Sequence, residues 1–363
     1  MPEAPIQSVK TSAYRIPTAM PESDGTLQWD TTVMVLVKIN SAGITGLGYT
    51  YGDISAAHLI KDKLAPLTSG NDPFDIPRLW REMREVVRNI GRPGIAATAI
   101  SAVDIALWDL KARLLEQPLV KLLGQVHSRI PVYGSGGFTS YAPETLQAQL
   151  DTWAEAGVRM VKMKVGREPD KDAERVRGVR EALPPSTRLF VDANGAYHRR
   201  QALAMAHAFA ESDVSWYEEP VSSDDLEGLR WLRDRCPVGM AIAAGEYGYE
   251  PRYFRRMLEA QSVDFIMPDV TRCGGITGYL EIAALAAAFD TPVSTHCAPS
   301  LGVHVGCAVR AQQHLEYFHD HVHIEQALFD GAPRVKNGCL APDLNRPGLG
   351  LDFKPQDAER YAL

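Results

Sequence analysis

The sequence of 363 residues has few cysteines and no long apolar run. Its five cysteines are odd in number, scattered and without a CxxC pair, so neither a disulfide framework nor a zinc ribbon is expected. No stretch approaches the roughly 18 apolar residues of a membrane span, and residues 1–10 lack the pattern of a secretory signal. The sequence therefore predicts a soluble, cytoplasmic protein with buried free thiols.

An excess of basic residues is also missing. Lys and Arg number 38 against 45 for Asp and Glu, which gives a formal net charge of −7. A negative charge argues against binding to nucleic acid or to an anionic membrane surface, because both are recognised through basic patches. We therefore expect a small-molecule partner, with no nucleic acid and no membrane.

The length and the changing hydrophobic pattern predict two domains. In residues 31–51, two strand-like apolar runs flank a turn-forming stretch, as in a hairpin. Apolar residues then recur at helical spacing over residues 100–114. These features predict an N-terminal α+β domain over residues 1–121, with the short segment 346–363 packing back on the rest of the chain.

From residue 130 onward, short apolar runs alternate with amphipathic segments, which is typical of repeated βα units. Eight such runs in a region of this size most simply close into a (β/α)8 barrel, predicted over residues 122–345. The expected fold class is therefore α/β, a TIM-like barrel with an N-terminal α+β domain. The runs are 131–134, 160–165, 189–194, 214–218, 241–246, 265–270, 292–296 and 313–317.

An ionisable residue stands at or near the carboxyl end of successive runs. Side chains at these ends of barrel strands converge on the mouth, where active sites form. Asp192, Glu218 and Glu246 would repel one another there unless a cation joins them, so we predict a metal site. Carboxylate oxygens suit Mg2+ better than zinc. The full set is Lys164, Asp192, Glu218, Glu246, Asp269, His296 and Glu316.

Three basic side chains are expected beside this metal site. Lys162 and Lys164 are separated by one residue and point to the same face of a strand, where each cation should lower the pKa of the other. His296 should pair with Asp269 on the preceding strand, which would fix the imidazole tautomer and raise its basicity. We interpret Lys164 and His296, on opposite sides of the barrel, as acid/base residues.

Short motifs surround these residues in a fixed order. They are Lys162-Met163-Lys164, Val191-Asp192-Ala193-Asn194, Glu218-Glu219-Pro220, Gly245-Glu246, Pro268-Asp269, Gly274-Gly275, Ser294-Thr295-His296, His314-Leu315-Glu316 and Pro347-Gly348-Leu349-Gly350. In register and order they resemble the enolase superfamily, mandelate racemase subgroup, over essentially the whole chain. The resemblance implies an N-terminal capping domain that closes over the barrel mouth, and a homo-oligomer.

The resemblance also implies roles for the site residues. The three carboxylates would bind Mg2+, Lys164 would be one acid/base residue, and His296 with Asp269 the other. Lys162 and Glu316 would offer charge and a hydrogen bond to the substrate carboxylate. Glu316 must be protonated to donate that bond, a state that its acidic neighbours favour.

The shared chemistry is removal of the proton next to a carboxylate, which gives an enediolate that Mg2+ stabilises. A hydroxyl on the next carbon can then leave as water. We therefore predict a Mg2+-dependent lyase that dehydrates a sugar acid, an aldonate or aldarate, to a 2-keto-3-deoxy acid. Racemisation or epimerisation of a 2-hydroxy acid stays open, because Lys164 and His296 can serve opposite faces. A non-catalytic binding protein is a more distant alternative.

The polar composition of two N-terminal segments bears on the substrate. Residues 21–30 and 50–55 are rich in hydroxyls, amides and acids, as recognition of a polyol chain requires. We expect Trp29 and Tyr51, which lie in these segments, to touch the substrate. Asn194, near the predicted metal ligands in the barrel, is expected to touch it as well.

Histidines alternate after the last predicted strand, at His319, His321 and His323. An extended segment would place the three imidazoles on one face, where they could bind a second metal or contact the substrate. The favoured interpretation is a polar loop that packs locally, because no carboxylate pattern accompanies the histidines.

Overall fold

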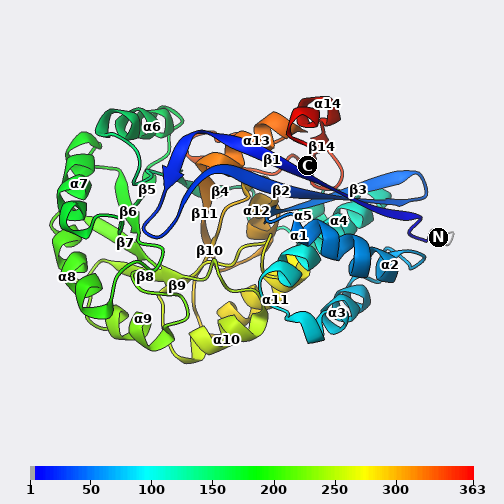
Figure 1. The fold of residues 1–363 in the computed structure, drawn as a ribbon, viewed down its shortest axis with the longest axis horizontal. Helices are drawn as coiled ribbons and strands as arrows, with labels where there is room; N and C mark the ends of the chain where they lie inside the picture. The colour runs from blue at the N-terminus through cyan, green and yellow to red at the C-terminus, as the bar shows by residue number, and fades with distance from the viewer. Residues whose placement is uncertain (1–4) are drawn as a thin grey trace.

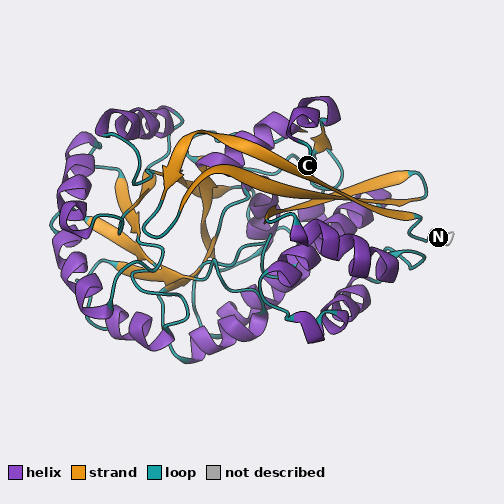
Figure 2. Cartoon of the chain, in the orientation of Figure 1, coloured by secondary structure: helices purple, strands orange, loops and turns teal. Residues whose placement is uncertain are grey.

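The computed structural model describes residues 5–363. The first third of the chain forms a sheet covered by helices, and most of the remainder forms a barrel with strands inside a ring of helices (Figures 1 and 2). The two long strands at the N-terminus extend from the first domain across one end of the barrel (Figure 1). The predicted fold class is confirmed.

The N-terminal domain is built on an antiparallel sheet in the order β1 (Ser8–Ser23), β2 (Gln28–Ser41), β3 (Ile44–Gly52). The predicted hairpin is β2 with β3, and β1 adds a strand outside the predicted run. The long helix α4 (Ile95–Leu114) packs directly on β3, where a Cβ on Gly48 would lie only 2.2 Å from a backbone oxygen. The remaining elements are α1 (Ser55–Leu59), η1 (Ile60–Leu64), α2 (Ala65–Thr68), α3 (Ile76–Val86), η2 (Arg88–Ile90) and α5 (Leu119–Leu123).

Within residues 5–363, eight parallel strands run in sequence order from β4 to β11, and β11 pairs with β4 to close the barrel. All eight predicted runs correspond to these strands. The strands are β4 (Ile130–Gly136), β5 (Met160–Lys164), β6 (Arg188–Asp192), β7 (Val214–Glu218), β8 (Ala241–Ala244), β9 (Phe265–Ile266), β10 (Val293–Thr295) and β11 (Gln312–Phe318).

A helix follows each barrel strand and covers its outer face (Figure 2). Apolar residues on the outward side of the strands pack against these helices and form the main core. The helices are α6 (Pro143–Glu155), α7 (Pro169–Ala182), α8 (Arg199–Ala210), α9 (Leu226–Arg233), α10 (Pro251–Glu259), α11 (Gly275–Ala288), α12 (Pro299–Ala308) and α13 (His319–Leu328).

The histidine-rich segment is helical, so both the extended segment and the polar loop are wrong. It forms the first turns of α13, where His321, Ile324 and Leu328 recur at helical spacing on a buried face. Residues two apart in a helix point in nearly opposite directions, and His319 and His323 therefore lie on a different side from His321.

Aromatic side chains fill the lower part of the barrel. Tyr133, Phe190 and Trp216 are fully buried, and their rings contact one another with centroids 5.3 to 6.4 Å apart. His314 lies among them, stacked on Phe265 with 5.7 Å between ring centroids. Residues two apart on a strand point to the same side, so the inward-facing residue after each of these rings lies at the carboxyl end of the strand. The aromatic layer therefore lies directly beneath the polar residues of the barrel mouth.

The C-terminal segment contacts the N-terminal domain. Its last backbone N–H, from Leu363, donates to Ala13 of β1, and the Leu351 carbonyl accepts a hydrogen bond from Arg113 of α4. The domain boundaries at residues 121 and 345 stay predictions. The segment and its neighbours include β12 (Phe329–Asp330), β13 (Cys339–Leu340), β14 (Asp352–Phe353), α14 (Pro355–Ala358) and η3 (Glu359–Tyr361).

The five cysteines are free thiols, three of them buried. Cys236 and Cys339 are half-buried, so the expectation of burial holds only in part. Among the residues that the structure describes, no helix combines the length and the apolar character needed to cross a membrane.

Candidate active site

Three buried carboxylates meet at the mouth of the barrel. Asp192 ends β6, Glu218 ends β7, and Glu246 follows β8. One carboxylate oxygen of each lies within 4.8 Å of the other two. Glu246 follows Gly245, whose φ of 142° is rarely adopted by other residues, and a Cβ added there would lie only 2.8 Å from the backbone nitrogen of Met267. The predicted convergence is therefore present.

The three carboxylates place several negative charges close together in a buried site. Burial, and then the neighbouring Asp192 carboxylate, raise the pKa of Glu218 to about 8. Buried acids of like charge raise one another's pKa in this way unless a cation is shared between them. The donor set contains only carboxylate oxygens, which fits a hard divalent ion such as Mg2+.

Both lysines of the β5 motif lie inside the barrel. Lys162 Nζ is 2.5 Å from Glu218 Oε1 and 2.8 Å from Glu316 Oε1. Lys164 Nζ is 2.5 Å from Asp192 Oδ2. The Lys162 charge does lower the pKa of Lys164, as predicted, but the predicted net lowering of the two pKa values is wrong. Burial lowers the pKa of each amine, but the facing carboxylates outweigh burial and raise both.

His296 is held by Asp269. The distance between His296 Nδ1 and Asp269 Oδ2 is 2.7 Å. The other carboxylate oxygen of Asp269 accepts hydrogen bonds from the backbone N–H and the hydroxyl of Thr271. Since the carboxylate only accepts, Nδ1 carries the ring proton, and Nε2 faces the cavity with Glu246 Oε2 at 2.9 Å. Burial lowers the pKa of His296, but Cys297 and Glu246 foremost raise it well above its usual value.

Glu316 is ionised, which corrects the expectation of a protonated carboxyl. Burial raises its pKa, but the Lys162 ammonium, followed by His296, lowers it further than burial raises it. Its oxygens accept hydrogen bonds from the Ser135 hydroxyl at 2.5 Å and from the Cys297 backbone N–H at 3.3 Å. The acidic neighbours matter less than the buried lysine in direct contact.

A cavity of about 370 Å³ lies between the two domains at the mouth of the barrel. Trp29 and Tyr51 reach it from the N-terminal domain, and Asn194 reaches it from the barrel. Asn194 has a left-handed φ of 47°, and its backbone N–H donates to Asp192. Its side-chain Oδ1 is buried without a partner among the described residues. The three residues predicted to bind substrate therefore line one cavity, together with Lys164, Glu246, His296 and Glu316.

Two further cavity residues were not singled out from the sequence. Arg272 donates to the backbone oxygen of Glu246, and its Nε lies 3.5 Å from Asp269 Oδ2. Cys297 places its sulfur 3.2 Å from His296 Nε2. Each stands within three residues of a predicted site residue, and this proximity is the signal that could have found them.

The N-terminal strands are held over the mouth by polar contacts of the half-buried Trp29 and by an aromatic stack. Trp29 Nε1 donates to Glu22 at 3.1 Å and to Asp320 of α13 at 3.2 Å. Burial and the Asp320 charge raise the pKa of Glu22 to about 9. Tyr51 stacks on His321 with 3.6 Å between ring centroids. His321 is thus a wall of the cavity rather than one of three clustered imidazoles.

Comparison with known proteins gives two family matches. Residues 7–124 match the mandelate racemase and muconate lactonizing enzyme N-terminal domain, and residues 145–358 match the enolase C-terminal domain-like family. The 3,6-anhydro-alpha-L-galactonate cycloisomerase of Streptomyces coelicolor is 36% identical over 96% of this chain and 98% of that protein. The L-talarate/galactarate dehydratase of Salmonella typhimurium is 32% identical over 97% of this chain and 89% of that protein. These relatives are enzymes.

Solved structures agree over the whole chain. A mandelate racemase/muconate lactonizing enzyme-like protein from Rubrobacter xylanophilus superposes with a TM-score of 0.96, with 54% identity and 99% of both chains covered. A racemase from Streptomyces coelicolor with bound magnesium gives a TM-score of 0.93, with 34% identity over 99% of this chain and 100% of that one.

Proposed function

The chain belongs to the mandelate racemase and muconate lactonizing enzyme family of the enolase superfamily, and from that premise we propose that it removes the α-proton of a sugar acid. The observation that carries the proposal is the trio of buried carboxylates within 4.8 Å of one another, with Lys164 and His296 lining the same cavity. Asp192, Glu218 and Glu246 would hold Mg2+. When bound, Mg2+ supplies positive charge to the substrate carboxylate as the enediolate forms.

His296 moves one proton. Asp269 keeps a ring proton on Nδ1. Glu246, a proposed ligand, is among the charges that raise the pKa of His296, so sharing that carboxylate with a divalent cation brings the pKa down and leaves Nε2 able to accept the α-proton. Lys164 is the second acid/base group. Its pKa is raised by Asp192, a proposed ligand, so sharing that carboxylate with a divalent cation brings the pKa down. Lys162, pinned between Glu218 and Glu316, stays charged and provides fixed positive charge at the substrate carboxylate.

The reaction that we propose is dehydration of an aldonate or aldarate. After the α-proton is removed, a protonated His296 or Lys164 gives a proton to the hydroxyl on the next carbon, and the C–O bond breaks. One water leaves, and the enol that remains tautomerises to a 2-keto-3-deoxy acid. The dehydratase among the relatives supports this outcome, and so does the Oδ1 of Asn194, which has no partner among the described residues and belongs to a residue that lines the cavity.

Cycloisomerisation is a second candidate, favoured by the 36% identical cycloisomerase. If the leaving oxygen belongs to a ring ether, the same proton transfers break the C–O bond and open the ring. No water is then lost, and the product keeps the mass of the substrate. Racemisation needs only that the second base returns a proton to the opposite face, and a racemase is among the similar structures.

The test is a panel of aldonates, aldarates and anhydro-aldonates, incubated with enzyme and Mg2+ in deuterated water. After allowance for the one deuterium that the enol takes up at C3, a 2-keto acid lighter by one water indicates dehydration, and one with the mass of the substrate indicates cycloisomerisation. Deuterium at the α-carbon without keto acid indicates racemisation. Lys164→Ala and His296→Asn should each abolish turnover, while Lys171→Ala, at a lysine whose side chain is 70% exposed, should not. Neither keto acid nor exchange on any acid would refute the proposal.

A further inference from the structure

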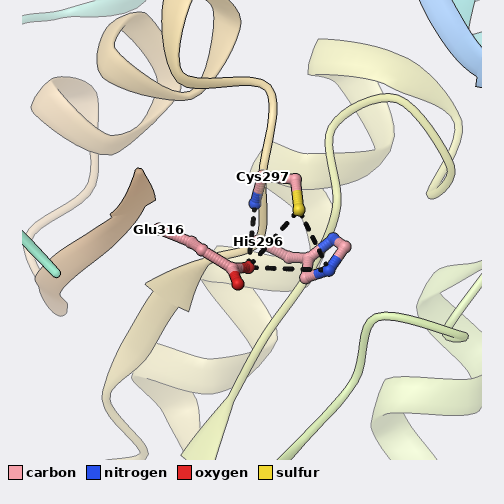
Figure 3. A group of neighbouring side chains, drawn as sticks. All are labelled: His296, Cys297 and Glu316. Carbon is pink, nitrogen blue, oxygen red and sulfur yellow. Dashed lines mark hydrogen bonds and ion pairs between the residues drawn. The ribbon is translucent and has the colours of Figure 1, made fainter. Parts of the chain in front are cut away.

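Three donor atoms of different chemistry meet beside the carboxylate cluster. His296 Nε2 lies 3.2 Å from Cys297 Sγ and 3.5 Å from Glu316 Oε2, and Cys297 Sγ lies 3.5 Å from the same Glu316 oxygen. Figure 3 shows the three side chains turned toward one another, with the sulfur facing both the imidazole and the carboxylate. Neighbouring residues of a strand point to opposite faces, but Cys297 has a left-handed φ of 46°, which brings both side chains to one side.

The triangle of donors has the dimensions of one face of a zinc tetrahedron. With Zn–S near 2.3 Å and Zn–N and Zn–O near 2.0 Å, tetrahedral angles give edges of about 3.5 Å for S–N and S–O and about 3.3 Å for N–O. The observed edges of 3.2, 3.5 and 3.5 Å match these values to about 0.3 Å. An ion seated on this face keeps its fourth position open.

The chemistry and the access also suit such an ion. A thiolate and a carboxylate balance the charge of a divalent cation when the imidazole is neutral. The sulfur makes this site softer than the all-oxygen cluster, so it selects Zn2+ rather than Mg2+. All three residues line the cavity of about 370 Å³, through which an ion can enter.

We propose that His296, Cys297 and Glu316 form a second metal site, which takes Zn2+ and inhibits the enzyme. Zinc bound there occupies the Nε2 lone pair of His296, and this atom can then no longer accept a proton. The binding is independent of the proposed function, whereas the inhibition rests on it. Excess zinc would thus compete with the substrate while Mg2+ keeps its own carboxylates.

Binding is tested with Co2+ as a spectroscopic substitute for zinc, in the presence of saturating Mg2+. We expect the near-ultraviolet absorption of a thiolate-to-cobalt charge transfer, which added Zn2+ removes. Cys297→Ser should lose this band and bind Zn2+ at least about tenfold more weakly in competition with a chromophoric chelator. Cys339→Ser, at a half-buried thiol, and Asp192→Asn, at the carboxylate cluster, should keep the band.

A measurement on the unmodified chain guards against a variant that fails to fold. Zn2+ should protect Cys297, but not Cys339, from alkylation by iodoacetamide, as read from peptide masses. The proposal is overturned if wild-type protein shows no charge-transfer band, if the band survives Cys297→Ser or disappears in Asp192→Asn, or if zinc leaves the labelling of Cys297 unchanged.

Inhibition is tested by α-proton exchange in deuterated water. Zinc should suppress exchange at saturating Mg2+, a chelator should restore it, and Cys297→Ser should need about tenfold more zinc. Equal inhibition of both proteins would place the effect at the carboxylate cluster and refute the inhibitory role. Absence of exchange on every acid refutes the proposed function instead, and leaves the cobalt result standing.

Discussion

Replacing Asp269 by Asn tests whether the tautomer of His296 controls one face of the active site. Asp269 Oδ1 accepts hydrogen bonds from the Thr271 backbone N–H at 2.6 Å and hydroxyl at 2.7 Å. In the Asn variant these donors hold the amide oxygen, so the NH2 group must face His296. An NH2 donor makes Nδ1 an acceptor and moves the ring proton to Nε2, which faces the cavity.

An imidazole protonated at Nε2 cannot accept the α-proton. We expect exchange on the face served by His296 to fall about 10⁴-fold, the loss found when the aspartate of a Ser-His-Asp triad is changed to Asn. This loss corresponds to about 5.5 kcal/mol of transition-state stabilisation. Lys164 is paired with Asp192 at 2.5 Å and not with Asp269. Exchange on the face that Lys164 serves should therefore change less than about tenfold in the Asp269→Asn variant.

Deuterium incorporation into the two epimers of a substrate acid reports the two faces separately. The melting temperature of the Asp269→Asn variant serves as the control for folding. Because the two residues act as a unit, the Asp269→Asn/His296→Asn double variant should be no slower than His296→Asn alone. The reasoning fails if exchange falls equally on both faces, or if the His296 face keeps exchange within tenfold of wild type.

Three other predictions concern metal and pH. A chelator should abolish turnover. Mg2+ at one hundred times its dissociation constant should raise the free energy of unfolding by about 2.7 kcal/mol, and an unchanged melting temperature on adding Mg2+ would contradict that stabilisation. Burial, followed by the Arg188 and Lys162 charges, lowers the pKa of His314 to about 3. The stability that neutral His314 contributes is therefore present above about pH 6.5 and lost toward pH 3, at up to about 1.4 kcal/mol per pH unit. Urea unfolding of His314→Leu should show a free energy of unfolding that falls less steeply with decreasing pH than that of the wild type. Burial and Asp320 raise the pKa of Glu22 to about 9. Its stability contribution is present below about pH 4.5 and lost as pH rises to 9, so Glu22→Gln should remove that decline, and an unchanged slope would assign it elsewhere.

The positions of the three carboxylates proposed to hold Mg2+ could be predicted from the sequence alone. Asp192, Glu218 and Glu246 each close an apolar run, and a parallel barrel brings the carboxyl ends of such runs to one mouth. The pairing of His296 with Asp269 follows from the same rule, because β9 and β10 are neighbours. Topology alone determines these contacts, so the spacing of residues along the chain was sufficient.

The protonation states could not be predicted in this way. Lys162 of β5 contacts Glu316 of β11 across the barrel interior, and this contact sets the charge of both groups. It depends on side-chain length and burial rather than on spacing. The error at α13 has another cause. The alternating histidines masked a buried helical stripe of His321, Ile324 and Leu328, which the sequence does contain.

The aromatic layer of Tyr133, Phe190 and Trp216 closes one end of the barrel, so the cavity has its entrance at the other end. Its base is closed by fully buried rings, so substrate must enter, and product must leave, beneath the strands that Trp29 fastens to Asp320. Product still inside blocks the next molecule, and its inhibition should therefore be competitive with substrate.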